Sequence, residues 1–254
     1  MILQHAEEAI RVLPMSAPID RVVVLGTTGS TQDDARRLAL GKPGLVVMAE
    51  HQTKGRGRLG RLWADISMMS LPATFAIRGW TPEHLSLASG IAACRTVEAF
   101  LPSEVGVGIR WPNDVVEIRA GGAGRKLSGV LIEAADGLHL VGIGINVLHE
   151  ERHWPPELVK NACSLRQLGC ETTRAHVAAE LITNLARALM TDPAELVEQW
   201  RRRNVLVGQR CVFIHNGVTH AGVVQDIDPA NEIVLEVTPS RVVRLPALTT
   251  SMVK

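Results

Sequence analysis

Short apolar runs alternate with polar, helix-forming segments over the first part of the chain. Arg21–Gly26 and Leu45–Ala49 are rich in Val and Leu, which predicts two buried strands. Between them, Ser30-Thr31-Gln32-Asp33 has the composition of a helix cap, and the helix it opens should end at Gly41 and Pro43. The pattern therefore predicts a strand–helix–strand start.

The middle of the chain contains further strand patterns. Ala73–Ile77 and Val105–Trp111 are apolar enough for strands. Two longer apolar runs, Leu127–Ala134 and Leu138–Ile145, are joined by Asp136-Gly137, a dipeptide typical of tight hairpin turns. We expect these two runs to pair as an antiparallel hairpin.

Helical spacing marks three other segments. Apolar residues recur at helical intervals over 83–101, and every fourth residue from Val177 to Leu189 is apolar. Asp192-Pro193-Ala194-Glu195 places Asp at an N-cap, Pro at the first helical position and Glu in the first turn. These patterns predict two long helices and a shorter third one.

After Asn204 the pattern changes to short β-type runs separated by turns, among them Asn216-Gly217. We therefore divide the chain into a lead over 1–20, a main domain over 21–203 and a small all-β domain over 204–254. The main domain is expected to be α+β, with a mixed sheet flanked by helices.

Composition narrows the possible classes of function. The chain has 254 residues, 46% of them hydrophobic, and a formal net charge of +1, which argues against a broad nucleic-acid or membrane surface. No secretory signal or long apolar span is evident, so we expect a cytoplasmic protein. The four cysteines are far apart, which predicts no metal centre of their own: Cys94, Cys163, Cys170 and Cys211.

The segment Gly55-Arg56-Gly57-Arg58-Leu59-Gly60-Arg61, followed by Trp63, concentrates unusual chemistry. Glycines allow a ligand to approach the backbone closely, and arginine forks match carboxylate and phosphate oxygens. A nearby indole can stack on a flat base. The segment alone predicts either a site that joins an organic acid to a nucleotide or a basic surface loop beside a core tryptophan.

Other strand ends carry polar groups as well. They are Ser30-Thr31-Gln32, Glu50-His51-Gln52, Arg110-Trp111-Pro112-Asn113-Asp114, Arg125-Lys126-Leu127-Ser128-Gly129 and Gly142-Ile143-Gly144-Ile145-Asn146. Rigid elements often present functional groups at such junctions. Together with the glycine-rich segment, this ordered set resembles the biotin protein ligases over about residues 21–200, and the tail resembles their SH3-like C-terminal domain.

The resemblance implies the class II synthetase-like fold of biotin and lipoate ligases and a two-step reaction. Biotin and ATP, with Mg²⁺, give biotinyl-adenylate and pyrophosphate, and the biotinyl group then passes to a lysine of a carboxylase carrier domain. It further implies a protein that acts on small molecules and a carrier protein, without a membrane; family members often form homodimers through the sheet.

The resemblance also implies site residues by position. Arg56 and Lys126 would neutralise the reacting anions, and Asp114 would lie where the acceptor lysine arrives, to orient it or to accept its proton. Biotin is expected to contact Ser30, Thr31, Gln32, Gln52, Gly55, Arg56, Gly57, Arg58, Lys126 and Gly129. The nucleotide is expected to contact Arg58, Trp63, Asn146 and Arg110.

Some positions depart from the family pattern. Arg110 replaces a lysine, and Met68-Met69 occupy the place of a glycine-containing turn. Pro72 cannot donate to a strand ladder, so we expect the strand to start after it or to lie at an edge. Glu133 lies in an apolar strand, which predicts either an ion pair or an edge position for it.

Three other functions remain open from the sequence. A lipoate or octanoate ligase or transferase shares the fold, but Gly-Arg-Gly-Arg with Gln52 favours biotin. A non-catalytic biotin sensor is suggested by Arg110 and Met68. A biotin-dependent repressor needs a DNA-binding domain, which the lead over 1–20 is too short to supply, so we expect no DNA partner. A P-loop hydrolase is a weaker candidate, since its G-x-x-x-x-G-K-[ST] motif is missing.

Overall fold

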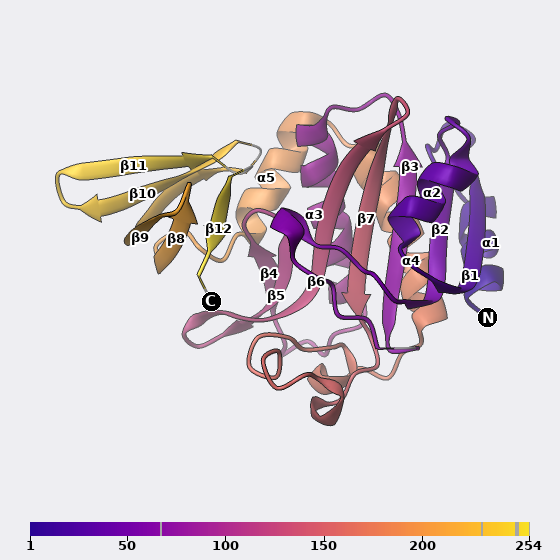
Figure 1. The fold of residues 1–254 in the computed structure, drawn as a ribbon, viewed down its shortest axis with the longest axis horizontal. Coiled ribbons are helices and arrows are strands. Elements are labelled where there is room, and N and C mark those ends of the chain that lie inside the picture. Colours follow the sequence, from indigo (N-terminus) through magenta and orange to yellow (C-terminus); the bar gives the residue numbers. More distant parts are fainter. Residues whose placement is uncertain (67, 230, 247–248, 254) are drawn as a thin grey trace.

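The computed structural model describes residues 1–66, 68–229, 231–246 and 249–253. Its centre is a seven-stranded mixed sheet in the order β1-β2-β3-β7-β6-β5-β4 (Figure 1). β1 and β2 are parallel, and the other neighbours are antiparallel. The strands are β1 Arg21–Thr28, β2 Leu45–Gln52, β3 Ser70–Ile77, β4 Val107–Arg110, β5 Asp114–Arg119, β6 Gly122–Ala135 and β7 Leu138–Asn146.

Helices cover both faces of this sheet. The helices are α1 Ile2–Arg11, α2 Thr31–Ala39, α3 Pro82–Glu98, α4 Arg174–Leu189 and α5 Pro193–Arg203. In Figure 1, α2 lies in front of the sheet, while α3 and α4 lie behind it. Ser30 and Thr81 cap α2 and α3, and Asp192 caps α5 as its sequence predicts. The expected α+β class, a mixed sheet flanked by helices, is confirmed.

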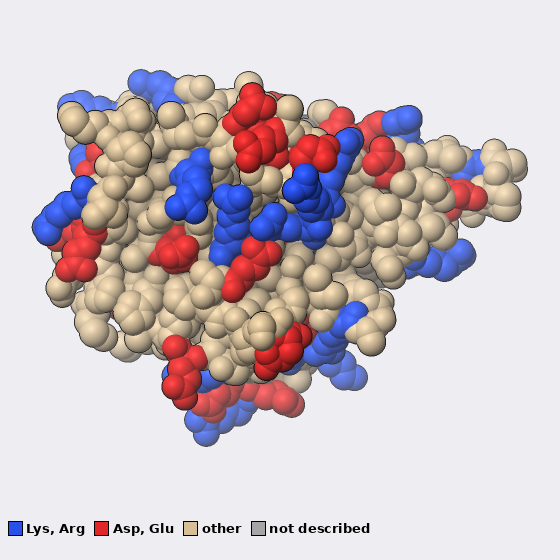
Figure 2. Space-filling view, turned by 180° about the vertical axis from the view of Figure 1, so that it is seen from behind, with Lys and Arg blue, Asp and Glu red and all other residues tan. Residues whose placement is uncertain are grey.

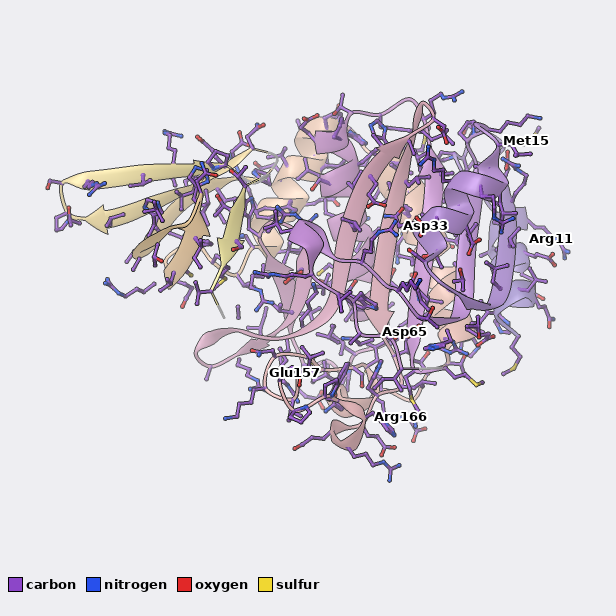
Figure 3. The ribbon with its side chains drawn as sticks, in the orientation of Figure 1. Arg11, Met15, Asp33, Asp65, Glu157 and Arg166 are labelled. Atoms are coloured by element: carbon purple, nitrogen blue, oxygen red, sulfur yellow. The ribbon has the colours of Figure 1, made fainter. Side chains whose placement is uncertain are left out.

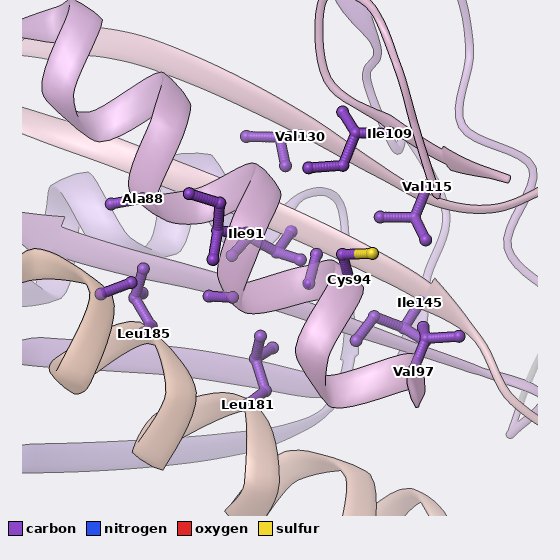
Figure 4. Close-up of a cluster of buried hydrophobic side chains, with 14 of the residues drawn as sticks. Ala88, Ile91, Cys94, Val97, Ile109, Val115, Val130, Ile145, Leu181 and Leu185 are labelled. Carbon is purple, nitrogen blue, oxygen red and sulfur yellow. The ribbon is translucent and has the colours of Figure 1, made fainter. Parts of the chain in front are cut away.

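Strand alternation separates two apolar layers. Val46 and Met48 of β2 join the large core behind the sheet, whereas Leu45 and Val47 join a small core beneath α2. The large core packs α3 and α4 against the sheet and includes Cys94, which is fully buried as a packed thiol (Figure 4). The front face is thus only partly filled by α2, which leaves room for a site beside it.

A second, five-stranded antiparallel sheet follows α5, in the order β11-β10-β9-β8-β12. Asn216-Gly217 forms the predicted turn between its first two strands. The strands are β8 Arg210–His215, β9 Val218–Asp228, β10 Glu232–Thr238, β11 Arg241–Pro246 and β12 Thr250–Met252. This small β unit extends to one side of the main sheet (Figure 1).

The structure adds one helix to the expected elements and corrects one expectation. The lead over 1–20 contains α1, whose Ile2, Ala6 and Ala9 are buried in the large core. The expectation for Pro72 was wrong, because β3 begins at Ser70 and lies inside the sheet between β2 and β7. The proline is tolerated since the β2–β3 pairs end at Ala73, so Pro72 lies beyond the last of them.

The surface carries both signs of charge. Figure 2 views the molecule from behind, and Lys and Arg gather near the middle of that face, next to Asp and Glu. Positive charge is therefore not confined to the side that carries α2. Among the described residues, no helix is long and apolar enough to cross a membrane.

Candidate active site

A cavity of about 280 Å³ opens on the front face of the main sheet. α2, the glycine-rich segment, the strands β3, β5, β6 and β7, and β12 contribute to its walls. The predicted site residues that line it are Ser30, Thr31, Gln32, Gln52, Arg56, Gly57, Arg58, Trp63, Arg110, Asp114, Lys126, Gly129 and Asn146. The fold thus brings together residues that lie up to 116 positions apart.

Glycines keep the floor of the cavity open. On β7, Val141, Ile143 and Ile145 face the large core, so Gly142 and Gly144 face the front. A Cβ at Gly144 would lie 2.6 Å from the Trp63 ring, and one at Gly142 would lie 2.8 Å from Gln32 Nε2. The indole and the amide can therefore lie directly on the sheet.

One end of the cavity is polar and buried. The backbone N–H of Thr31 donates to Gln52 Oε1 at 2.8 Å, and the Thr31 hydroxyl donates to the same oxygen at 3.1 Å. Gln32 Nε2 donates to the Leu131 carbonyl, while Gln32 Oε1 is buried without a hydrogen-bond partner. Buried polar atoms need partners, so this end suits a ligand with amide-like N–H and C=O groups.

The cavity base holds an ion cluster, which we call the base cluster: Lys126, Asp114 and Arg110. Lys126 Nζ lies 2.5 Å from Asp114 Oδ1, and Arg110 Nη2 lies 3.0 Å from Asp114 Oδ2. Burial opposes the charge of Asp114, but the two cations outweigh it and lower the pKa of the carboxyl to about 2. Asp114 is therefore an ionised, weakly basic carboxylate at neutral pH.

Trp63 and Asn146 flank the base cluster. Lys126 Nζ lies 5.4 Å from the centre of the Trp63 ring, a cation–π distance. Asn146 Nδ2 donates to the carbonyls of Lys126 and Cys163, which fixes the amide and leaves its Oδ1 as the atom able to accept from a base. Lys126, Trp63 and Asn146 form one wall of the cavity.

The glycine-rich segment folds back on itself as a small hairpin above the floor. Trp63 N–H donates to the Gly55 carbonyl at 3.0 Å, Gly57 N–H donates to Arg61 O at 2.7 Å, and Arg56 pairs with Leu62. The expectation that Gly55 contacts biotin is corrected, because Gly55 is not among the residues that line the cavity. A Cβ there would lie 2.6 Å from Gln52 Nε2, so Gly55 allows close packing beneath the hairpin.

Two arginines of this hairpin have different surroundings. Arg58 Nη1 donates to Asn113 Oδ1 at 3.5 Å, and burial lowers the pKa of its guanidinium. Arg56 is bound by two carboxylates: Asp33 accepts from both terminal nitrogens at 2.9 Å, and Glu133 accepts at 3.0 Å. Of the two alternatives predicted for Glu133, an ion pair or an edge position, the structure shows the ion pair, since β6 is not an edge strand.

The sequence did not indicate several residues around the cavity. The side chain of Asp65 is fully buried and accepts from Gln52 N–H at 2.6 Å, which anchors the end of β2. Met68, at the position noted for a glycine-containing turn, has φ of 63°, the conformation a glycine would adopt there. Cavity-lining residues outside every noted motif include Leu158, Asn161 and, from β12, Thr250, Ser251 and Met252.

No metal centre is visible in the described part of the chain, where no three His, Cys, Asp or Glu residues cluster as ligands. The carboxylate nearest the cavity base, Asp114, is already bound by two cations.

The sequence is similar to those of known ligases. The model of the biotin/lipoate A/B protein ligase family matches residues 24–148. The biotin–[acetyl-CoA-carboxylase] ligase of Mycobacterium tuberculosis is 34% identical over 234 residues, which cover 84% of this chain and 82% of that protein. The bifunctional ligase/repressor BirA of Bacillus subtilis is 31% identical over 153 residues, 56% of this chain and 45% of that protein.

Solved structures show the same fold. The biotin protein ligase from Aquifex aeolicus in complex with biotin and ATP aligns with a TM-score of 0.79 at 23% identity, covering 93% of this chain and 100% of that one. The biotin protein ligase from Leishmania major in complex with biotinyl-5-AMP aligns with a TM-score of 0.61 at 21% identity, covering 89% and 98% of the two chains.

Proposed function

We infer that this chain, which belongs to the biotin/lipoate A/B protein ligase family, is an ATP-dependent biotin ligase. It forms biotinyl-5′-AMP from biotin and ATP and then transfers the biotinyl group to a lysine of a carboxylase carrier domain. The observation that carries the proposal is one cavity with a buried amide-binding end and a cationic base.

The polar end is proposed to hold the ureido ring of biotin. Thr31, Gln52 and the unpartnered Gln32 Oε1 offer donors and an acceptor, and Ser30 adds a hydroxyl beside them. An unmade hydrogen bond in such a buried place costs about 1–3 kcal/mol. This end therefore selects a bicyclic urea over the dithiolane ring of lipoate, which has no amide.

The cationic base is proposed to bring the two anions together. A biotin carboxylate oxygen attacks the α-phosphorus of ATP, the P–O bond to the β-phosphate breaks, and pyrophosphate leaves. At 4 Å two unit charges repel by about 4 kcal/mol at an effective dielectric of 20. Lys126 and Arg58 would offset this repulsion, and Mg²⁺ bound to the ATP oxygens would supply further charge neutralisation.

Nucleotide recognition is proposed for the wall beside the base cluster. The Trp63 ring would stack on adenine, and Asn146 Oδ1 would accept from its exocyclic amine. Arg110 is proposed to act indirectly, because its guanidinium is bound to Asp114 and to the Gly124 carbonyl. It helps to fix the carboxylate that orients Lys126.

In the second step, the carrier lysine loses its ammonium proton to water, and the free amine attacks the acyl carbon. AMP leaves from that carbon with the electrons of the C–O bond, and the second amine proton passes to water. Asp114 is a weak base since its pKa is about 2. We therefore assign it the orienting role of the two that the sequence allowed, through Lys126 and the incoming ammonium. The hairpin over 55–63 would shield the mixed anhydride from water.

We also propose a partner, a location and an oligomeric state for the enzyme. The partner is a biotin carrier domain, which the name of the relative from M. tuberculosis suggests. We further propose action in the cytoplasm, no DNA partner for this chain, and a homodimer through the sheet. Light scattering tests the last of these.

The test is mass spectrometry of a carrier domain incubated with this protein, biotin, ATP and magnesium. Addition of one biotinyl group to one lysine is expected. Lipoate in place of biotin, and biotin without ATP, are the matched controls. Modification by lipoate in preference to biotin would overturn the substrate assignment, and binding of biotin without any pyrophosphate release would show a sensor instead.

A further inference from the structure

Three segments far apart in the sequence meet at one guanidinium on the cavity rim. We call this the rim cluster: Arg56 from the glycine-rich hairpin, Asp33 from the first turn of α2, and Glu133 from β6. Asp33 binds the guanidinium through both oxygens at 2.9 Å, and Glu133 Oε2 lies 3.0 Å from Nη2. Figure 3 shows Asp33 where α2 overlies the sheet.

The rim cluster has an excess of negative charge. Arg56 lowers the pKa of Asp33, and the two carboxylates raise the pKa of Arg56, so the ionised forms of Asp33 and Arg56 are favoured. Two carboxylates around one guanidinium leave a net formal charge of −1. An anionic substrate that approached Arg56 would therefore also meet Asp33 and Glu133, which disfavours this arginine as the group that binds phosphate.

The position of Arg56 instead suits a role in holding the glycine-rich hairpin in place. Its backbone pairs with Leu62 at the stem of the hairpin, and Gly57 and Arg58, which follow it, line the cavity. The tip of the hairpin is held separately, through Arg58 and Asn113. A bidentate Arg–carboxylate pair has a fixed orientation, so the rim cluster fixes the stem of the hairpin to α2 and β6.

We propose that Arg56 is a positioning residue rather than a catalytic one: with Asp33 and Glu133 it clamps the glycine-rich hairpin over the bound acyl-adenylate. The proposal rests on the proposed function for its substrates. Among the side chains it assigns the anion-neutralising role to Lys126 and Arg58, and it differs from the role that the resemblance implies for Arg56.

The clamp and a charge-supplying Arg56 predict opposite effects when the carboxylates are removed. If Arg56 neutralises the reacting anions, Asp33 and Glu133 compete with the substrate, and their removal leaves adenylation as fast as before or faster. If Arg56 is a clamp, their removal loosens the hairpin, and biotinyl-adenylate leaves sooner. The sign of the effect therefore decides between the two roles.

The experiment compares D33N/E133Q, R56Q and the triple variant with the wild type. Loss of two exposed ion pairs is expected to have an effect of about tenfold. D33N/E133Q should therefore release labelled biotinyl-adenylate about tenfold faster than the wild type, and its KM for biotin should rise by about the same factor. The single-turnover rate of adenylation at saturating biotin should stay within about twofold, since no reacting charge is lost. R56Q should match the double variant, and the triple variant should be no worse, because all three share one interaction.

A loss of about 100-fold in the adenylation rate of R56Q, with D33N/E133Q unchanged or faster, overturns the clamp. A second measurement needs no activity. Trypsin cleavage after Arg58 and Arg61 in the substrate-free protein should be faster in D33N/E133Q, because the hairpin opens more often. Equal cleavage rates overturn the clamp, whereas a wild type that forms no adenylate refutes only the proposed function.

Discussion

The base cluster and the rim cluster use the same chemistry in different surroundings. In each, cations and carboxylates meet at 2.5–3.0 Å beside one cavity. At the base, Arg110 is 9% exposed and Lys126 and Asp114 are about a quarter exposed, whereas in the rim cluster Asp33 is 67% exposed. Their charge balance also differs, with two cations per carboxylate at the base and two carboxylates per cation at the rim.

The exposure and the net charge of the two clusters suit them to different tasks. The base cluster keeps a net positive charge in a poorly solvated place, where Coulomb interactions are strong. The rim cluster is solvated, so its bonds are individually weak and can exchange with water. The first arrangement suits charge neutralisation in a reaction, and the second suits a closure that must open to admit substrate and release product.

The largest effect should follow from removing the cation at the base. Lys126→Met is expected to slow adenylation by at least about 100-fold, since a preorganised charge next to the reacting phosphate is lost. Pyrophosphate exchange measures the rate. Lys54→Met, an exposed lysine next to the same hairpin, is the matched control and should retain the wild-type rate. A Lys126 variant as fast as that control would refute the role of the base cluster.

The next effect concerns stability and its dependence on pH. The folded-state pKa of Asp114 is about 2, below its ordinary value of 3.8, so its ionised form stabilises the fold. Asp114→Asn should lose about 2 kcal/mol at pH 7, since a pKa unit corresponds to about 1.4 kcal/mol. The stabilisation is fully present above pH 4 and disappears as the pH falls to 2.

Urea denaturation at pH 7 and at pH 2–3 measures this difference. The free energies of unfolding of the wild type and Asp114→Asn should converge as the pH falls. A constant gap across that range would show that Asp114 contributes packing rather than charge.

The sequence predicted the two clusters unequally. Lys126, Asp114 and Arg110 each lie in a motif noted in the sequence, and the resemblance to the biotin protein ligases implied that these motifs share one site. Asp33 follows the cap of α2 and is indistinguishable by sequence from an acidic residue that only favours a helix N-terminus. Glu133 was conspicuous in an apolar strand, but its partner lies 77 residues away and depends on how the hairpin folds.

The differences between the expected and the observed fold have separate origins. The sequence analysis treated residues 1–20 only as a lead and named no helix there, although α1 is amphipathic and buries Ile2, Ala6 and Ala9. The position of Pro72 depends on where the β2–β3 ladder stops, which is set by pairing and not by the strand itself. Local patterns predicted the Asp136-Gly137 and Asn216-Gly217 turns because a turn is decided by its own residues.

The effects of variants at the two clusters should also differ in their dependence on salt concentration. The Debye length falls from about 10 Å at 0.1 M to about 3 Å at 1 M, and exposed pairs are screened most. The difference in adenylate release between wild type and D33N/E133Q should therefore shrink from about tenfold toward about twofold in 1 M NaCl. The defect of Lys126→Met should persist. A rim effect that is independent of salt would mean that its side chains act by packing.

The smallest effect is expected at a third pair with the geometry of the rim but no contact with the hairpin. Arg36 binds Asp136 through both oxygens at 2.8 and 3.3 Å, and both side chains are more than half exposed. Asp136→Asn keeps the left-handed backbone of the turn, φ 53°, because Asn tolerates it. Surface pairs contribute little, so the melting temperature should move by less than about 2 °C, and adenylate release should not change. Arg36 also interacts with Asp33 through its charge. If Asp136→Asn released adenylate as fast as D33N/E133Q, the freed Arg36 would compete for Asp33 as strongly as Arg56 does, and the special position of Arg56 would be refuted.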